Sequence, residues 1–342
     1  MSSAAPALAV DAMGGDHAPE ALVAGSLSAL REERDLRLIL VGPPERLRPL
    51  VGALEELGDR LSLEESEGPI PMQAHPAHAI RQQPRCSVVV ALKLVSSGRA
   101  DACFSAGSTG ATMAAALLQL RRRPGFARPA IGTCFPSRSG STLLVDAGAQ
   151  VDCRPEWLAQ FALLGNEYAR RALGVERPRV GLLSNGEETS KGNGLVQAAH
   201  QLLTQLELDY IGPVEGIDLV SGRVDVVVSD GFVGNVALKT AEGVAEAIID
   251  ALREEARAGL RSRLGAFLLL PGLKRLRRRL DWAQVGGAPL LGVSGLVFIG
   301  HGRSDARAVS SALRVAAAAV RSGLAEAWQS AREPLPAAAP GR

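Results

Sequence analysis

The sequence predicts a three-layer α/β/α fold built around a mainly parallel β-sheet. Short apolar runs alternate along most of the chain with segments of helical period, an alternation typical of β-α-β units. Two of the runs, residues 180–183 and 224–228, are almost continuously apolar instead of alternating with polar residues. Strands covered by helices on both faces have this character, so the sheet is expected to lie between two layers of helices.

Seven apolar runs are predicted to be strands, and most are followed by a turn that contains glycine. They are residues 8–10, 36–41, 102–104, 130–134, 142–145, 180–183 and 224–228. A later pair, residues 289–293 and 296–298, is separated by Ser-Gly and predicts a hairpin.

Several helix starts carry a local signal. Pro19 and Pro155 suit a first helical turn, and Ser304 or Asp305 can cap a helix that runs through Ala318. We find no internal repeat, so residues 1–333 are expected to form one large α/β/α catalytic domain, in one lobe or two. Residues 334–342 contain three prolines and are predicted to be a disordered tail.

The composition excludes several classes of protein. Of the 342 residues 46% are hydrophobic, which is enough for a sizeable core and excludes global disorder. Lys and Arg total 38 against 36 Asp and Glu, and aromatic residues make up only 4%. A chain this balanced in charge, with so few side chains for base stacking, is not expected to bind nucleic acid.

The cysteines and the apolar stretches indicate the compartment. The cysteines have no metal-binding or redox spacing and are expected to be reduced core residues: Cys86, Cys103, Cys134 and Cys153. The first residues lack the features of a signal peptide, and no apolar stretch approaches the roughly 20 residues of a spanning helix. We therefore expect a cytoplasmic protein, bound to a membrane at most peripherally.

Residues 256–282 depart from the α/β rhythm. Eight cations and no acid lie between residues 256 and 280, with leucines interleaved and Pro271-Gly272 dividing two helical arms. Such a basic amphipathic hairpin fits a membrane surface, an acidic carrier protein or a second copy of the chain, and the sequence leaves the three open. The residues expected at this surface are Phe267, Leu268, Leu269, Arg275, Arg277, Arg278 and Arg279.

Five polar, glycine-rich turns follow predicted strands. They are residues 11–19, 105–111, 184–194, 230–235 and 300–305. In parallel sheets ligands bind beyond the carboxyl ends of strands, where backbone N–H groups at helix starts favour anions. The residues expected to bind phosphate or substrate are Gly14, Gly15, Ser105, Gly107, Ser108, Thr109, Gly110, Asn193, Asp230, Gly231 and His301.

The lysines point to the same turns. Only four of the 38 cations are lysine, and two of these, Lys191 and Lys239, lie in or beside the turns. We expect both to bind an anion, with chance placement as the alternative. The sequence has no G-x-S-x-G elbow, no H-E-x-x-H and no nucleotide-binding fingerprint. It therefore indicates anion binding without a covalent nucleophile, and we expect neither a metal nor a cofactor.

Taken together, the motifs resemble those of the bacterial phosphate acyltransferases of phospholipid synthesis. Residues 9–19, Ala-Val-Asp-Ala-Met-Gly-Gly-Asp-His-Ala-Pro, are similar to the N-terminal signature of that family. Similar stretches follow in the same order, and the resemblance covers about residues 7–331. They are residues 105–111, 191–193, 230–235 and 286–292, then His301-Gly302 and Ser304-Asp305. The sequence departs from the family at Ser108, Val285, Gly300 and Arg303, and Ser108 stands where asparagine is usual.

The resemblance implies an activity and partners. The family transfers a long-chain fatty acyl group from acyl carrier protein to inorganic phosphate, which gives acyl phosphate for glycerol-3-phosphate acylation. It also implies a fold similar to phosphotransacetylases and isocitrate-type dehydrogenases, a homodimer, and peripheral contact with the inner face of the cell membrane. A membrane glycerol-3-phosphate acyltransferase would receive the product. Residues 256–282 match the family's helical insertion.

We expect phosphate to attack the thioester directly. The turn at residues 105–111, with Lys191 or Lys239, would hold phosphate, and positioning of the two substrates would be a major contribution. Asn235 or a backbone N–H would stabilise the oxyanion, and His17 would act as acid or base. The rivals are a phosphotransacetylase acting on a small acyl-CoA, a dehydrogenase of related fold, and a membrane-surface scaffold without activity.

Overall fold

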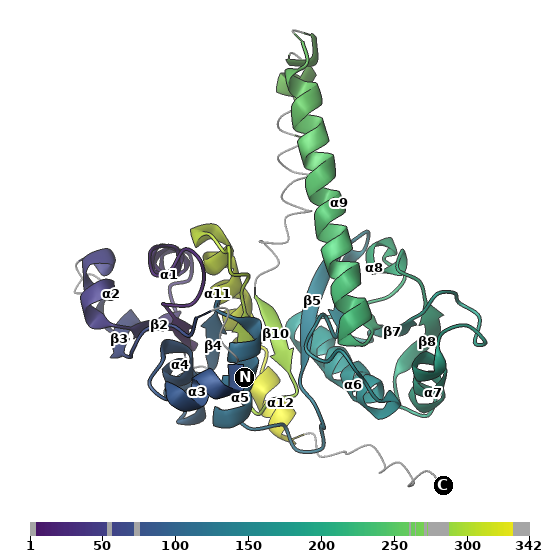
Figure 1. Ribbon diagram of the computed structural model, residues 1–342, viewed down its shortest axis with the longest axis horizontal. Helices are drawn as coiled ribbons and strands as arrows, with labels where there is room; N and C mark the ends of the chain where they lie inside the picture. Colours follow the sequence, from purple (N-terminus) through teal and green to yellow (C-terminus); the bar gives the residue numbers. More distant parts are fainter. Residues whose placement is uncertain are drawn as a thin grey trace.

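A single sheet of 11 strands runs through the whole molecule (Figure 1). The computed structural model describes residues 5–52, 57–71, 76–259, 261–263, 265–269, 272 and 287–330. In spatial order the strands are β3 (Leu61–Glu65), β2 (Arg37–Gly42), β1 (Ala7–Asp11), β4 (Ala102–Ser105), β11 (Leu296–Ile299), β10 (Ala288–Leu291), β5 (Ala130–Ser137), β6 (Gly140–Val145), β9 (Val226–Val228), β7 (Arg179–Leu183) and β8 (Asp209–Val214).

The sheet consists of two parallel halves that run in opposite directions. Strands β3, β2, β1, β4 and β11 are mutually parallel, and so are β6, β9, β7 and β8. Between the halves, β10 is antiparallel to both β11 and β5, and β5 is antiparallel to β6. We call the two blocks the N-terminal half and the C-terminal half. Each half has its own row of strand carboxyl ends, where turns can bind ligands.

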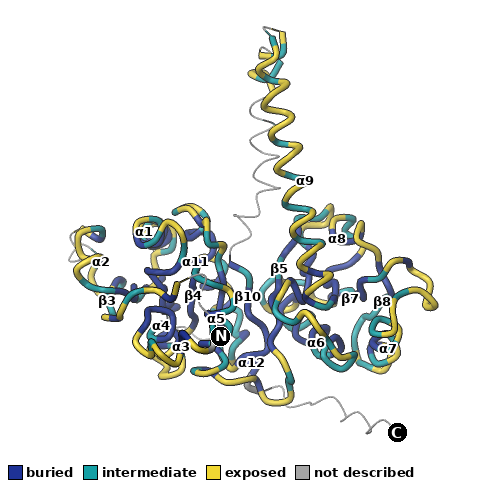
Figure 2. Tube along the Cα trace, in the orientation of Figure 1, coloured by how far each residue is buried: buried dark blue, intermediate teal, exposed yellow. Residues whose placement is uncertain are grey.

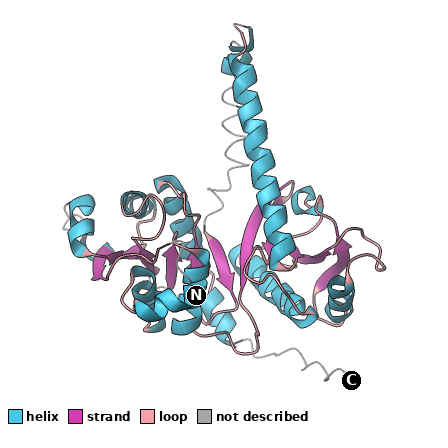
Figure 3. Ribbon diagram, in the orientation of Figure 1, coloured by secondary structure: helices cyan, strands magenta, loops and turns pink. Residues whose placement is uncertain are grey.

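Helices cover both faces of the sheet, which confirms the three-layer fold (Figure 3). One face is covered by α1 (Glu20–Glu32), α2 (Pro44–Val51), α6 (Pro155–Ala172), α7 (Gly194–Leu203), α11 (Ala306–Arg321) and α12 (Leu324–Ser330). The other is covered by α3 (Pro76–Gln82), α4 (Ser87–Ser96), α5 (Thr109–Gln119), α8 (Asp218–Ser221) and α9 (Gly231–Arg257). Successive residues of β1 divide between the two cores accordingly, with Leu8 and Val10 in one and Ala9 in the other.

Small residues let helices approach each other closely. A Cβ built on Gly25 of α1 would lie 2.5 Å from the Ala306 carbonyl oxygen at the start of α11. As expected from the sequence, Asp305 caps α11, because its Oδ1 accepts a hydrogen bond from the Ala308 N–H at 2.8 Å. Pro155 occupies the first turn of α6, also as expected.

Each predicted strand corresponds to an observed one, and the predicted late hairpin is confirmed as β10–β11. The prediction omitted β3 and β8, the two edge strands. Their burial is lower than that of the inner strands, and the sequences Leu-Ser-Leu-Glu-Glu and Asp-Tyr-Ile-Gly-Pro-Val do not form continuous apolar runs. The four cysteines are free, and Cys153 is the one that is only half-buried.

Helix α9 leaves the body of the molecule after its first turns (Figure 2). The hairpin was expected to begin at residue 256, whereas α9 runs unbroken from Gly231 to Arg257, so that Ala256 and Arg257 end a long helix. Val244, Ile248 and Leu252, which the sequence places on the apolar face of this helix, are about half exposed, at 53%, 56% and 48%. An apolar stripe without a partner in the described residues is a candidate contact surface.

The expected surface of the hairpin is described only in part. Phe267, Leu268 and Leu269 are exposed, at 69%, 71% and 62%. Arg275, Arg277, Arg278 and Arg279 lie outside the described residues, and so does the expected tail at residues 334–342. Within the described part of the chain, no helix has both the length and the apolar character needed to cross a bilayer.

Candidate active site

The five glycine-rich turns form two groups, one on each half of the sheet. In the N-terminal half, the turns after β1, β4 and β11 join one another. The Asp16 N–H donates to the Gly302 carbonyl at 2.7 Å, and the Gly300 N–H donates to the Ser105 carbonyl at 2.8 Å. In the C-terminal half, the turns after β7 and β9 line a shared cavity. Each group is therefore a candidate subsite.

The N-terminal group is built around a hydrogen bond between two buried side chains. Asp11 ends β1 and pairs in register with Ser105, which ends β4. The Ser105 hydroxyl donates to Asp11 Oδ2 at 2.6 Å, and its oxygen accepts from the Gly107 N–H at 3.2 Å. The Thr112 hydroxyl lies 3.4 Å from the same oxygen. The turn after β4 is thereby fixed to the turn after β1.

Glycine is required where these two turns meet. A Cβ on Gly14 would lie 2.6 Å from Asp11 Oδ2 and 2.8 Å from the Gly107 nitrogen. Gly15 has a φ of +110°, in the left-handed region that favours glycine. The Gly-Gly pair therefore allows the backbones to pack directly and leaves a cavity of about 170 Å³ beside them. Its lining includes Asp11, Gly14, Gly15, Ser105, Gly107, Ser108 and Thr112.

The start of α5 faces this small cavity. Ser108 is the N-cap, and its hydroxyl oxygen accepts from the Ala111 N–H at 3.4 Å. Thr109 and Gly110 follow in the first turn, where backbone N–H groups have no acceptor within the helix. The cavity thus combines hydroxyls with amides of a helix start, which is a suitable environment for an oxyanion.

The histidines of this group are exposed. His17 and His301 both lie on the surface of their turns, and neither lines the small cavity. His301 Nδ1 accepts a hydrogen bond from the Arg303 N–H at 3.3 Å. His17 thus stays accessible for proton transfer, and the structure gives it no partner that would set its orientation among the described residues.

Burial raises the pKa of Asp11 above its ordinary value of 3.8, although hydrogen bonds from the Ser105 hydroxyl and the Met13 N–H oppose the rise. A carboxyl that protonates more readily repels a bound oxyanion less. Sequence analysis placed Asp11 within the first turn but not among the site residues. The position of aspartate at the last residue of a buried strand was the available signal.

We expect the Asp11→Asn variant to reveal this shift. Because the folded-state pKa is raised, the contribution of the Asp11 carboxyl to stability is complete below the ordinary pKa and is lost as pH rises through the folded-state pKa. As pH rises, the free energy of unfolding of the wild type should fall relative to that of Asp11→Asn, with a slope of at most about 1.4 kcal/mol per pH unit. Urea unfolding at a series of pH values measures it, with exposed Asp16→Asn as control. A difference independent of pH would contradict the assignment.

The C-terminal group surrounds a larger cavity of about 460 Å³. Its lining is Leu158, Leu182, Leu183, Ser184, Asn185, Gly192, Asn193, Val196, Ser229, Asp230 and Val233. Asn193 and Asp230 are the N-caps of α7 and α9, and their side-chain oxygens accept from the Val196 and Val233 N–H groups at 3.0 and 2.8 Å. These two expected binding residues thus shape the rim by starting the helices that enclose the cavity.

The expected catalytic residues of this half lie near the rim. Lys191 is exposed and immediately precedes Gly192 and Asn193, which line the cavity. A Cβ on Gly186 would lie 2.9 Å from the Lys191 Cγ, so the Lys191 side chain packs over that glycine. Lys239 Nζ donates to Glu242 Oε2 at 2.7 Å in a half-exposed ion pair. Asn235 is exposed on the first turns of α9, with its Cβ 3.5 Å from where a Cβ on Gly148 would lie.

Asp146 holds the turn to which the start of α9 is bonded, and sequence analysis did not name Asp146 as a site residue. Its buried carboxylate accepts hydrogen bonds from the N–H groups of Ile131, Gly148, Ala149 and Gln150, at distances from 2.7 to 3.1 Å. The Gln150 carbonyl in turn accepts from the Gly231 N–H at 2.8 Å, which attaches α9 to the turn. Burial raises the pKa of Asp146, and these backbone donors oppose the rise.

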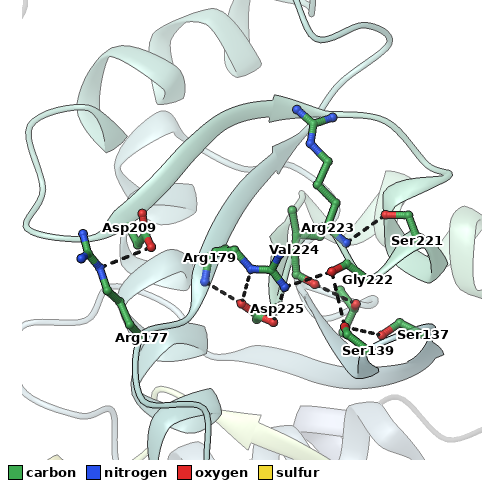
Figure 4. A network of polar contacts seen from close by, with 11 residues as sticks. Ser137, Ser139, Arg177, Arg179, Asp209, Ser221, Gly222, Arg223, Val224 and Asp225 are labelled. Carbon is green, nitrogen blue, oxygen red and sulfur yellow. Dashed lines mark hydrogen bonds and ion pairs between the residues drawn. The ribbon is translucent and has the colours of Figure 1, made fainter.

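The opposite, amino-terminal ends of the same strands carry ion pairs of a structural kind (Figure 4). The Arg179 guanidinium donates to Asp225 at 2.9 and 3.0 Å and to the Gly222 carbonyl at 3.0 Å, and Arg177 pairs with Asp209 at 3.3 Å. Burial raises the pKa of Asp225, but its bonds with Arg179 outweigh this and lower the pKa overall. These ion pairs join neighbouring strands and their flanking loops.

Metal-ligating side chains do not cluster. Across the described ranges, no three His, Cys, Asp or Glu side chains lie together in a way that could hold a metal ion.

Comparison with known proteins agrees with this arrangement. Residues 7–327 match the model of a family described as fatty acid synthesis protein. The phosphate acyltransferase of Nostoc punctiforme is 47% identical over 96% of this chain and 97% of its own length. That of Desulfitobacterium hafniense is 48% identical over 93% and 95%. The chain belongs to the phosphate acyltransferase family. This member of the family is an acyltransferase enzyme.

Solved structures extend the likeness to the fold alone. A phosphotransacetylase from Streptococcus pyogenes has a TM-score of 0.61 at 18% identity, with 92% of this chain and 94% of that chain covered. A 4-hydroxythreonine-4-phosphate dehydrogenase from Burkholderia phymatum has a TM-score of 0.51 at 17% identity, covering 92% and 98%. The expected similarity to phosphotransacetylases is confirmed at the level of fold.

Proposed function

We propose that this phosphate acyltransferase transfers a long-chain fatty acyl group from acyl carrier protein to inorganic phosphate. The product, acyl phosphate, would serve glycerol-3-phosphate acylation in phospholipid synthesis. The family supports acyl transfer to phosphate, and the observation in the structure that carries the rest is the pair of unlike subsites. The small one places hydroxyls and the start of a helix beside apolar side chains such as Ile70 and Val88. The larger one combines five apolar side chains with a polar rim that includes Asn193 and Asp230.

Phosphate binds in the small cavity of the N-terminal half. The start of α5 contributes Ser108, Ala111 and Thr112 to the lining, whereas Thr109 and Gly110 are not part of it, and Ser105 is held in place by Asp11. Because burial favours the neutral form of Asp11, the anion meets less repulsion than an ordinary aspartate would cause. The acyl donor binds on the C-terminal half, and positioning of the two substrates supplies much of the rate.

Lys191 neutralises the phosphate as it approaches the thioester. It is preferred over Lys239, because the Lys239 ammonium is already bonded to Glu242. Asn235, exposed on the first turns of α9, would donate to the developing oxyanion, and exposed His17 would exchange the proton with phosphate or the departing thiol. No covalent enzyme intermediate is required.

We expect Lys191→Ala to lower kcat/KM for phosphate by about 10²-fold, the usual cost of removing one group that stabilises developing charge. The side chain is exposed, so the thermal midpoint should stay unchanged. Lys93→Ala is the matched control, because Lys93 is an exposed lysine whose ammonium bonds the Pro84 carbonyl at 3.1 Å, away from both cavities. Near-normal activity of Lys191→Ala would refute its role.

The proposed reaction is tested by release of free thiol from palmitoyl-acyl carrier protein, with and without phosphate. Palmitoyl-CoA and acetyl-CoA serve as parallel donors. Phosphate-dependent release from the carrier-protein substrate supports the proposal. Release from acetyl-CoA alone would favour a phosphotransacetylase, and no release from folded protein would favour a scaffold.

Two exposed apolar surfaces, one on α9 and one at residues 267–269, support two further parts of the proposal. Val244, Ile248 and Leu252 would pack against the same helix of a second copy in a homodimer, since a helix face this apolar is stable when covered. Phe267, Leu268 and Leu269 would contact the inner face of the cell membrane. Light scattering should give twice the chain mass of 35.7 kDa, and anionic liposomes should retain the protein.

A further inference from the structure

The floor of the larger cavity is apolar. Leu158 of α6, Leu182 of β7, Val196 of α7 and Val233 of α9 contribute to it from four separate elements. Its volume of about 460 Å³ lies within the range of about 300–1,000 Å³ that is usual for small-molecule sites. Such a floor favours a ligand with a hydrocarbon portion, because burial of apolar surface drives its binding.

The charge of the lining disfavours an anion. Asp230 is the one ionisable side chain among the described residues that line the cavity, and no lysine, arginine or histidine is among them. A phosphate group placed inside would meet a carboxylate and apolar carbons, without a neighbouring cation in the lining. An uncharged group fits better.

An unpaired hydroxyl marks the boundary between the apolar floor and the polar rim. Ser184 follows the last residue of β7 and lines the cavity, and its Oγ is buried without a hydrogen-bond partner among the described residues. Buried hydroxyls nearly always have a partner in folded proteins. The oxygen is not accessible from the cavity as it stands, so a carbonyl oxygen of a bound ligand would supply the missing acceptor after the Ser184 side chain rotates toward the cavity.

The apolar surface continues outward from the cavity. Val236 lies three residues after Val233 and therefore on the same side of α9, and it is 50% exposed. Phe232, beside Val233, is 62% exposed. A long chain that extends past the mouth would still lie against apolar side chains.

We infer that the larger cavity binds the hydrocarbon chain of the acyl donor, with the thioester carbonyl at the Ser184 hydroxyl. The inference rests on the proposed function and adds to it the part of the molecule that selects the acyl chain. Leu158, Leu182, Val196 and Val233 surround the chain, while Asn193 and Asp230 hold the helix starts that close around it. Preference for acyl chains of a given length is therefore set by the part of the cavity that Val196 and Val233 line.

The test narrows the cavity. Val196→Phe should lower the ratio of kcat/KM for 16-carbon over 4-carbon acyl-carrier-protein donors by about tenfold or more, since single methylenes in such pockets are worth about 10–200-fold. Val233→Phe repeats the test at a position that is 41% exposed and tolerates a larger side chain. Val220→Phe, on α8 and outside the cavity lining, is the control and should leave the ratio unchanged.

A binding measurement separates this inference from the reaction. S-hexadecyl-pantetheine, a thioether that cannot transfer its chain, should bind the wild type and Val220→Phe, and bind Val196→Phe at least about tenfold more weakly. This result without any turnover would refute the proposed function and keep the inference. Folded Val196→Phe and Val233→Phe with unchanged chain-length ratios and unchanged thioether binding would overturn the inference, whether or not the wild type is active.

Discussion

Gly234→Ala is expected to destabilise the protein by about 3 kcal/mol or more, the upper end of what overpacking a buried position costs. A Cβ at this position would lie 1.9 Å from the Asp146 carbonyl oxygen and 3.0 Å from the Asp146 carbonyl carbon. Both atoms belong to backbone, and the turn that follows is held by the Asp146 carboxylate through its bonds to Gly148, Ala149 and Gln150. The turn therefore has little freedom to yield, and α9 must shift instead.

Gly243→Ala provides the matched control on the same helix. Outside its own helix, no atom of the described residues lies within 4 Å of a Cβ built there, so alanine should fit and stabilise the helix by about 0.8–1.0 kcal/mol through its higher helix propensity. Urea unfolding of both variants measures the contrast. Equal stabilities of the two variants would show that α9 does not pack against the Asp146 backbone as closely as the structure indicates.

The same close packing shows where sequence reasoning succeeded and where it stopped. Residues 180–183 and 224–228 were identified as buried strands because nearly all of their consecutive residues are apolar. Gly234 packs against Asp146, which lies 88 positions earlier in the chain, and no local sequence pattern predicts this contact. Asp146 itself follows β6 without any helix signal, so its role as an acceptor for four amides depends wholly on the three-dimensional turn.

The glycine-rich turns were recognised from the sequence, but their division into two groups was not. Each turn follows a strand and carries its own signal, as the Gly14-Gly15 pair does. Which turns meet depends on strand order and direction, and the short antiparallel link through β10 and β5 reverses the second half of the sheet. A hairpin between β5 and β6 has no helix between its strands, so the repeating β-α pattern concealed the reversal.

Lys239 illustrates the limit for individual side chains. Its placement four residues after Asn235 on one helix face followed from the helical period. Its ion pair with Glu242 also joins near neighbours, at a spacing of three residues. Periodicity shows that such a pair is possible but not whether the lysine bonds to Glu242 or to a ligand.

The Asp146→Ala variant should lose about 3–5 kcal/mol of stability, because it leaves several buried backbone N–H groups without an acceptor. Each such group costs about 1–3 kcal/mol. Relaxation of the turn and entry of water make the total smaller than the sum of these costs. Ile131 in β5 and Gln150 in the turn would lose their bonds of 2.9 and 2.7 Å. The start of α9, bonded to the same turn through Gly231, would then move and carry Asp230 away from the cavity rim.

Asp225→Ala separates loss of stability from loss of the site. Asp225 is also nearly buried in the C-terminal half, but it bonds Arg179 at the amino ends of the strands. The two carboxyls have opposite linkage. The lowered pKa of Asp225 gives stability that is present above pH 3.8 and is lost as pH falls through the folded-state pKa. The raised pKa of Asp146 gives stability that is lost as pH rises through the folded-state pKa.

Activity per folded molecule distinguishes the two variants. Both should unfold at lower urea concentration, while phosphate-dependent thiol release, corrected for the folded fraction, should fall for Asp146→Ala and stay near normal for Asp225→Ala. The reason is position, because one carboxylate lies beneath the cavity rim and the other at the far ends of the same strands. Equal activity in both folded fractions would mean that the turn after β6 stabilises the fold without shaping the site.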